Sequence, residues 1–186
     1  MAKCPICNKR KGKRECLMVD GFICSPCCGT NRKEASCSGC PFYKKPQRKY
    51  GDVPAYRVDE MDGNQELEDY SYAIEGALCT FDAMNNGKVQ DNDAIGTIEL
   101  LIDRYHFGDQ QIDSDNPFIL ECFHYVDDVI KKDMPDIDHK VLVKILGVIR
   151  FVARRRTNLG REYMEIIHRY VGKRIDTGLR VLPGIS

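Results

Sequence analysis

Cysteine is the residue type whose spacing in this sequence most clearly indicates chemistry. The 186 residues include ten cysteines, and eight of these fall within the first 40 positions. The eight are Cys4, Cys7, Cys16, Cys24, Cys27, Cys28, Cys37 and Cys40. They include three Cys-x2-Cys pairs, and two thiolates on one tight turn can bind the same tetrahedral ion. Eight thiolates therefore predict two four-thiolate sites, each holding one zinc ion.

The division of the eight cysteines between two ions follows from two neighbours in the chain. Adjacent Cys27 and Cys28 point in different directions, so they are expected to serve different ions. We favour Cys4, Cys7, Cys24 and Cys27 as one site, and Cys16, Cys28, Cys37 and Cys40 as the second. A single zinc with some free thiols is the alternative, and four-thiolate sets also suit iron–sulfur clusters.

The cellular compartment favours a metal over disulfides. No stretch approaches the roughly 18 apolar residues that a membrane-spanning helix needs, and the N-terminus lacks the apolar core of a secretory signal. We therefore expect a cytoplasmic protein, in which thiols stay reduced and bind metal. Cys79 and Cys122 stand alone in apolar helical patterns and are expected to be small buried hydrophobic residues.

The motif around Cys27 and Cys28 resembles a known pattern. The run from Ile23 to Arg32, followed by Cys37 to Tyr43, is similar to the Cys-rich N-terminal motif of a group of uncharacterised prokaryotic proteins. In that group a Cys-Cys-Gly-x-x-Arg core precedes another cysteine pair and an aromatic residue. The resemblance covers about the first quarter of the chain and implies a zinc-binding head without implying an activity. The Cys-Cys-Gly triplet also resembles the cluster-binding domain of heterodisulfide-reductase-type proteins, but only eight residues separate Cys28 from Cys37, which argues against that cluster.

Hydrophobic periodicity beyond the cysteines predicts helices. Residues 45–61 contain Pro46, Gly51 and Pro54 and are expected to form a linker. Five amphipathic helices follow, with expected starts at Asp62, at Asp91 or Asp93, at Asn116, at Asp138 and at Thr157 or Asn158. The fourth helix, apolar on nearly every side, is expected to be the central helix. The predicted fold is a small zinc-stabilised Cys-rich head (residues 1–44), the linker, an all-α bundle of about five helices (62–174) and a tail (175–186).

Three acid–histidine pairs suggest a different metal site. They are Asp103 with His106, Glu121 with His124, and Glu165 with His168. This spacing on helices of a bundle resembles the ligands of ferritin-like di-iron proteins, and a Cys-x2-Cys module beside such a bundle resembles rubrerythrin. The apolar faces of the third and fifth helices lie opposite Glu121/His124 and Glu165/His168, however, which favours solvated pairs. The alternative function is thus a redox or oxygen-handling iron protein, with iron in the head or in the bundle.

The charges are segregated although the net charge is zero. Residues 1–50 carry 12 Lys/Arg against three Asp/Glu, residues 51–149 carry seven against 22, and residues 150–186 carry nine against three. The candidate basic binding patch comprises Lys9, Arg10, Lys11, Lys13, Arg14, Arg150, Arg154, Arg155, Arg156 and Arg161. Such a patch can bind phosphates, or it can pair with the acidic part of the chain itself.

The absence of three well-known motifs argues against several reaction classes. The sequence has no phosphate-binding loop, no His-Glu-x-x-His motif and no nucleophile elbow. We therefore expect a non-enzymatic binding or scaffold protein that contacts nucleic acid or an acidic protein surface. No membrane partner and no small-molecule substrate are expected.

Overall fold

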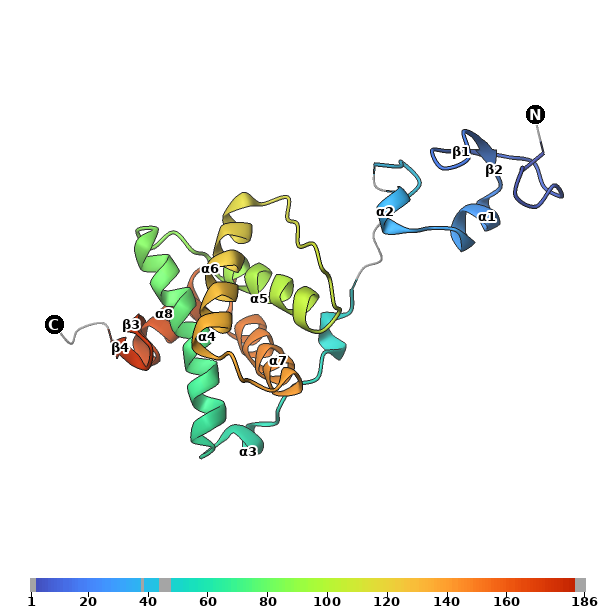
Figure 1. Ribbon diagram of the computed structural model, residues 1–186. Helices are drawn as coiled ribbons and strands as arrows, with labels where there is room; N and C mark the ends of the chain where they lie inside the picture. The colour runs from blue at the N-terminus through green and yellow to red at the C-terminus, as the bar shows by residue number, and fades with distance from the viewer. Residues whose placement is uncertain (1–2, 38, 44–47, 183–186) are drawn as a thin grey trace. The chain divides into compact units, whose positions relative to one another are not determined.

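The chain divides into two compact units, Met1–Arg48 and Lys49–Ser186. The structure is a computed structural model that describes residues 3–37, 39–43 and 48–182 (Figure 1). The first unit contains the head, and we call the second unit the helical body. The predicted linker falls largely in the body, where Val53 is part of the hydrophobic core. Residues 1–2, 38, 44–47 of the head and linker, and residues 183–186 of the predicted tail, lie outside the described residues.

The head is built from short elements. An antiparallel hairpin pairs β1 (Arg14–Cys16) with β2 (Gly21–Ile23), and α1 (Ser25–Thr30) and α2 (Glu34–Cys37) follow. Gly12 comes close to β2, because a Cβ atom at this position would lie 2.1 Å from the Phe22 carbonyl oxygen. A side chain here would push the first knuckle away from the hairpin.

The helical body contains the predicted helices and further short elements. Its elements are the 3-10 helix η1 (Tyr50–Asp52), α3 (Val58–Met61), α4 (Gln65–Met84), α5 (Asp91–Tyr105), α6 (Pro117–Asp133), α7 (His139–Arg156), α8 (Glu162–Tyr170), β3 (Lys173–Asp176) and β4 (Leu179–Val181). The mostly helical architecture is confirmed, but the helix count and the all-α character need correction. In the described part of the body, α3 adds a helix to the predicted five, and β3 pairs with β4 in an antiparallel hairpin where a tail was expected.

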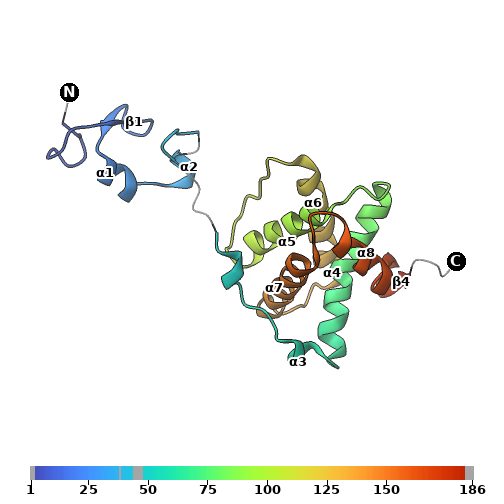
Figure 2. The ribbon, with the colours of Figure 1, turned by 180° about the vertical axis from the view of Figure 1, so that it is seen from behind.

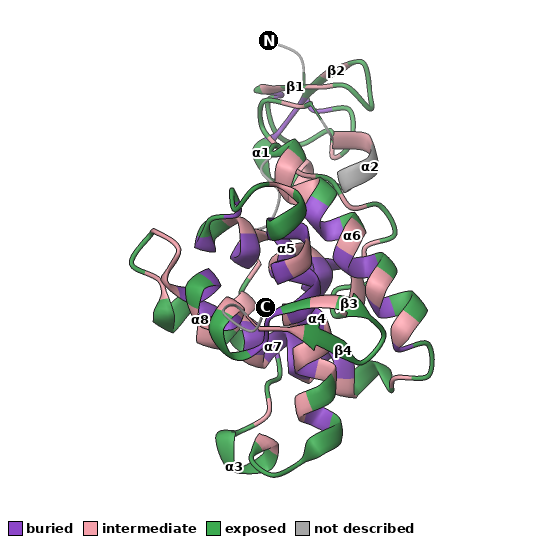
Figure 3. Ribbon diagram, turned by 90° about the vertical axis from the view of Figure 1, so that its left-hand side faces the viewer, coloured by how far each residue is buried: buried purple, intermediate pink, exposed green. Residues whose placement is uncertain are grey.

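The core of the body lies between the long helices. α4 packs against α6, α7, α8 and β3, and α5 packs against α6, α7 and α8. Figures 1 and 2 show α5 and α7 side by side from both directions, and Figure 3 shows the buried residues on the facing sides of the helices. α7 is not the single central helix that its composition predicts. Its Phe151 is 55% exposed, and α4 and α5 share the central position.

Helix starts follow local capping in some cases and distant contacts in others. The predicted start of α6 is confirmed, since the Asn116 side chain accepts a hydrogen bond from the Phe118 N–H and Pro117 occupies the first turn. The predicted cap of α4 at Asp62 is wrong. Gly63 has a φ of +74°, which interrupts the helix, and Asn64 caps it by accepting from the Leu67 N–H.

The partly buried Glu75 on α4 makes the stability of the body depend on pH. Burial raises the pKa of Glu75 from 4.5 to about 7, although the Tyr163 hydroxyl donates a hydrogen bond to its Oε1 at 2.9 Å. The folded protein therefore keeps this proton to a higher pH than the unfolded chain does. Stability is expected to fall as the pH rises from about 4.5 to about 7.

Replacing Glu75 with glutamine removes this titration and keeps an acceptor for Tyr163. We expect Glu75→Gln to raise the free energy of unfolding by about 1–3 kcal/mol at pH 8, and by much less at pH 5. Urea denaturation at the two pH values measures the difference. An equal effect at both values would show that Glu75 does not titrate in this window.

Candidate metal centre

Four cysteines of the head form a group suited to one tetrahedral ion. The sulfur atoms of Cys4, Cys7, Cys24 and Cys27 all lie within 4.8 Å of one another. The Sγ atoms of Cys7 and Cys24 are 3.8 Å apart. A tetrahedral site with zinc–sulfur bonds of about 2.3 Å needs sulfur atoms about 3.8 Å apart. The observed spacing therefore fits a four-thiolate zinc centre.

Two local structures bring these four thiols together. Cys4 and Cys7 lie on a knuckle, in which the Cys4 N–H donates to the Arg10 carbonyl and the Asn8 N–H donates to the Cys4 carbonyl, both at 2.8 Å. Asn8 completes this turn with a φ of +52°. Cys24 is the N-cap residue of α1, and Cys27 lies in its first turn. The pairs Cys4/Cys7 and Cys24/Cys27 thus contribute all four of their thiols to one site.

The backbone of the knuckle favours ionised thiols. Burial raises the pKa of the Cys4 thiol, but backbone hydrogen bonds from Cys24, Cys7 and Ile6 outweigh this effect and lower the pKa to about 6. Backbone hydrogen bonds at Lys9 and Arg10 also lower the pKa of Cys7.

Among the four thiols, Cys27 is the one that holds its proton most tightly. A hydrogen bond with Cys24, together with burial, raises the pKa of Cys27 to about 12. Four thiolates in one place therefore need a cation, which a metal ion supplies.

The core of the head consists largely of these thiols. In the described part of the first unit, the buried core comprises Cys4, Ile23 and Cys24, with other cysteines packed around it. A unit of this size cannot fold on so small an apolar core alone. The four thiol ligands and the small apolar core both fit a head in which a metal ion supplies the folding free energy.

The other predicted thiol ligands are not gathered in the same way. Cys16, Cys28, Cys37 and Cys40 are partly buried, and they form no comparable group within the described residues. The Arg14 guanidinium donates to the Cys28 Sγ at 3.5 Å. This hydrogen bond is the main cause that lowers the pKa of Cys28, and the charge of Arg32 acts in the same direction. Cys79 and Cys122 are fully buried in the body.

The acid–histidine pairs do not meet at one point. Among the described residues, the four cysteines form a group with the spacing of metal ligands, and none of these histidines belongs to such a group. Glu121, His124 and Glu165 are exposed, as the helical pattern predicts. The expectation of solvated pairs is wrong for two residues. Asp103 is buried and accepts a hydrogen bond from Tyr50, and His168 bonds to Asp82 rather than facing solvent.

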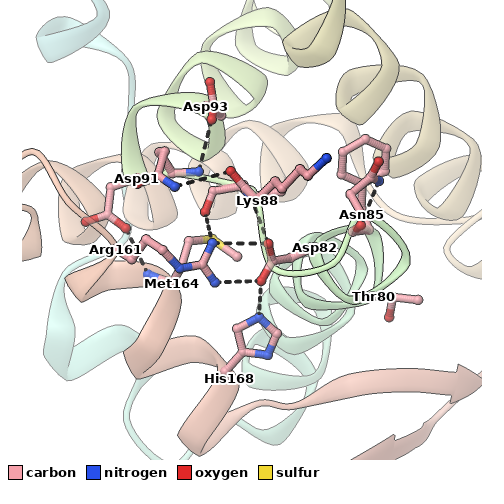
Figure 4. Close-up of polar contacts among 12 residues, drawn as sticks. Thr80, Asp82, Asn85, Lys88, Asp91, Asp93, Arg161, Met164 and His168 are labelled. Carbon is pink, nitrogen blue, oxygen red and sulfur yellow. Dashed lines mark hydrogen bonds and ion pairs between the residues drawn. The ribbon is translucent and has the colours of Figure 1, made fainter.

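The most extensive polar cluster of the body surrounds Asp82 on α4 (Figure 4). Arg161 Nη2 donates to Asp82 Oδ2 at 2.8 Å, and His168 Nε2 lies 2.7 Å from the same oxygen. Arg161 also donates to the Val89 carbonyl, and the Val89 N–H donates to Asp82 Oδ1 at 2.8 Å. Burial raises the pKa of Asp82. The hydrogen bonds from Arg161, Val89 and His168 have a larger, opposite effect, so the pKa lies below its ordinary value.

A second aspartate joins the same elements. Asp91, at the start of α5, accepts hydrogen bonds from the backbone N–H groups of Tyr163 and Met164 in the first turn of α8. The two aspartates therefore fix α8 to α4 and α5. The partners of both aspartates are groups of the protein itself that lie on other elements, which is the pattern of a structural cluster.

The basic residues of the predicted patch have different surroundings. In the head, Lys9, Arg10, Lys11 and Lys13 are exposed. In the body, Arg150 and Arg154 both form ion pairs with Glu99, and Arg161 pairs with Asp82. Arg155 and Arg156 are exposed at the end of α7, where Arg155 lies over the ring of Phe151.

Comparisons with known proteins give no further assignment. No protein-family model, no curated protein and no solved structure matches the chain significantly.

Proposed function

We propose that this chain is a zinc-binding protein whose head is folded by zinc and serves, with the helical body, as a binding or scaffold module. The convergence of Cys4, Cys7, Cys24 and Cys27 supports this proposal most directly. The eight thiols of the head suggest two zinc ions per chain, as the spacing predicts. We propose a cytoplasmic, non-enzymatic role.

The exposed basic residues indicate the surface that contacts a partner. Lys9, Lys11 and Lys13 alternate along the segment between the knuckle and β1, and all three are exposed. The body has a separate pair of exposed cations, Arg155 and Arg156, because ion pairs with Glu99 and Asp82 occupy Arg150, Arg154 and Arg161. Free cations of this kind attract phosphates, so we propose nucleic acid as the partner and an acidic protein surface as the alternative.

Salt dependence tests the nucleic-acid proposal. Each phosphate contact adds about 0.9 to the slope of log K against log salt concentration on double-stranded DNA. Replacing Lys9, Lys11 and Lys13 together by glutamine is expected to weaken binding and to reduce this slope by up to about 3. Fluorescence anisotropy with labelled DNA and RNA over a salt series measures both quantities.

The matched control is Lys140→Gln, which removes an exposed lysine near the start of α7. This variant should bind as the wild type does. If the wild type binds neither DNA nor RNA at low salt, nucleic acid is excluded, and an acidic protein surface becomes the partner to seek.

A further inference from the structure

The head contains a cavity whose walls hold the four cysteines that the first centre does not use. Its volume is about 130 Å3, and Cys16, Cys28, Cys37 and Cys40 all line it. Cys16 ends β1, Cys28 lies in α1 and Cys37 ends α2, so three elements contribute thiols. The Cys40 N–H donates to the Cys37 carbonyl at 3.0 Å, which places the last two cysteines on one turn. This is again the Cys-x2-Cys geometry that presents two thiols to one ion.

Polar groups at the cavity wall suit thiolates. The hydroxyl oxygen of Ser36 is buried, has no hydrogen-bond partner among the described residues, and belongs to a residue that lines the cavity. An unsatisfied buried hydroxyl is unfavourable, and a thiolate could accept its hydrogen bond. Arg14 already donates to Cys28, and its guanidinium lies 5.4 Å from the ring centre of Phe42, two residues after Cys40. Arg14 thus connects α1 with the turn that carries Cys37 and Cys40.

Much of the remaining lining of the cavity is apolar. It includes Ile6, Leu17, Met18, Val19 and Ile23, and the polar residues Glu15 and Asn31 also line the cavity. Apolar neighbours lower the local dielectric constant, which strengthens the interaction between thiolates and a cation.

We propose that this cavity is a second zinc site, formed by Cys16, Cys28, Cys37 and Cys40, with Arg14 as its positioning residue. The inference rests on the proposed zinc-binding function and assigns its second ion. Four thiolates and one zinc ion carry a net charge of −2, which the adjacent Arg14 offsets in part. Arg14 is then a component of the metal site rather than part of the basic surface.

The two sites differ in how far they are assembled. The first four sulfur atoms already lie within coordinating range of one another, whereas the second four surround a cavity. Binding of the second ion must bring these four sulfur atoms closer together, and this ordering reduces the apparent affinity. We expect the second ion to bind at least about tenfold more weakly than the first.

Metal counting on full-length variants tests the proposal. The wild type is expected to bind two zinc ions, and the double variant Cys37→Ser/Cys40→Ser is expected to bind one. The matched control Cys79→Ala, which removes a buried thiol of the body, should retain two. Native mass spectrometry and elemental analysis measure the counts.

The outcomes separate this inference from the proposed function. One zinc in both the wild type and the Cys37→Ser/Cys40→Ser variant would overturn the second site and leave the first standing. No zinc in the wild type would overturn the proposed function itself.

Substitution of Arg14 tests its role without removing a ligand. Arg14→Gln is expected to weaken binding of the second ion by about 10–100-fold, the usual effect of losing a group that orients a ligand. Arg14→Lys should restore part of this affinity, and the first site should be unchanged in both variants. Titration with Co2+, whose thiolate absorption reports each site in turn, gives both affinities. Equal affinities in the wild type and Arg14→Gln would contradict the role of Arg14.

Discussion

Removal of zinc with a strong chelator is expected to unfold the head and to leave the helical body folded. The buried core of the described head is made of Cys4, Ile23 and Cys24, so the ion replaces the apolar contacts that hold a larger domain together. Structural zinc contributes about 10–16 kcal/mol of apparent binding free energy in zinc-finger peptides, which far exceeds what such a core supplies. The body has its own extensive core between α4, α5, α6, α7 and α8.

Hydrogen exchange with and without the chelator measures the effect on each unit. Amides of the β1–β2 hairpin should lose protection, and amides of α4 and α5 should keep it. The variant Cys4→Ser/Cys7→Ser should reproduce the chelator effect in the head, while Cys122→Ala, which lacks a thiol of the body, should not. A head that remains protected in excess chelator would show that metal does not fold it.

The second large effect is expected at Asp82. Its side chain is 2% exposed and accepts bonds from both Arg161 and His168. Removing Asp82 leaves the partly buried Arg161 and His168 without their acceptor, so Asp82→Ala is expected to lower the free energy of unfolding by about 2–4 kcal/mol. Because the pKa of Asp82 is lowered in the folded state, its contribution is present at neutral pH and is lost as the pH falls below about 4.

Urea denaturation of the full chain, followed by the helical signal, measures this loss. Asp128→Ala is the matched control, because Asp128 is an exposed aspartate on α6. Its substitution should change the stability by no more than about 0.5 kcal/mol. If Asp82→Ala and Asp128→Ala have the same effect, the cluster around Asp82 does not hold α8 in place.

Features of the fold that depend on neighbouring residues could be predicted from the sequence. The start of α6 at Asn116 and Pro117 and the cap of α7 at Asp138 are set by side chains that bond within three residues. The start of α8 could not be predicted in this way. Asp91 caps it from a distance of more than 70 residues in the chain, and Leu159, with a φ of +71°, keeps the preceding segment out of the helix.

The terminal hairpin has the same kind of explanation. The strand β3 is held through Thr80 of α4, whose Oγ1 accepts a hydrogen bond from the Arg174 N–H at 2.8 Å. The Arg174 side chain crosses Gly76 of the same helix, where a Cβ atom would lie 2.7 Å from its Cγ. Neither contact produces a periodic pattern in the sequence, so the sequence alone predicts a tail over residues 175–186 and no hairpin.

The ligands of the candidate metal centre could be predicted from the sequence more directly than the surroundings of the basic residues. Cys-x2-Cys spacing has a direct geometric meaning, and the pairs Cys4/Cys7 and Cys24/Cys27 converge in the structure. The environment of Arg161 depends instead on Asp82, 79 residues away in the chain. A run of arginines shows where charge is concentrated, but its partners are set by tertiary packing.

The metal content of the wild-type chain tests the central claim most directly. Protein purified without added metal and without oxygen would be examined by elemental mass spectrometry together with a visible absorption spectrum. We predict zinc, at about two ions per chain for two four-thiolate sites, and a colourless protein. Iron in stoichiometric amount, with visible absorption from iron–thiolate centres, would contradict it and would favour the redox alternative.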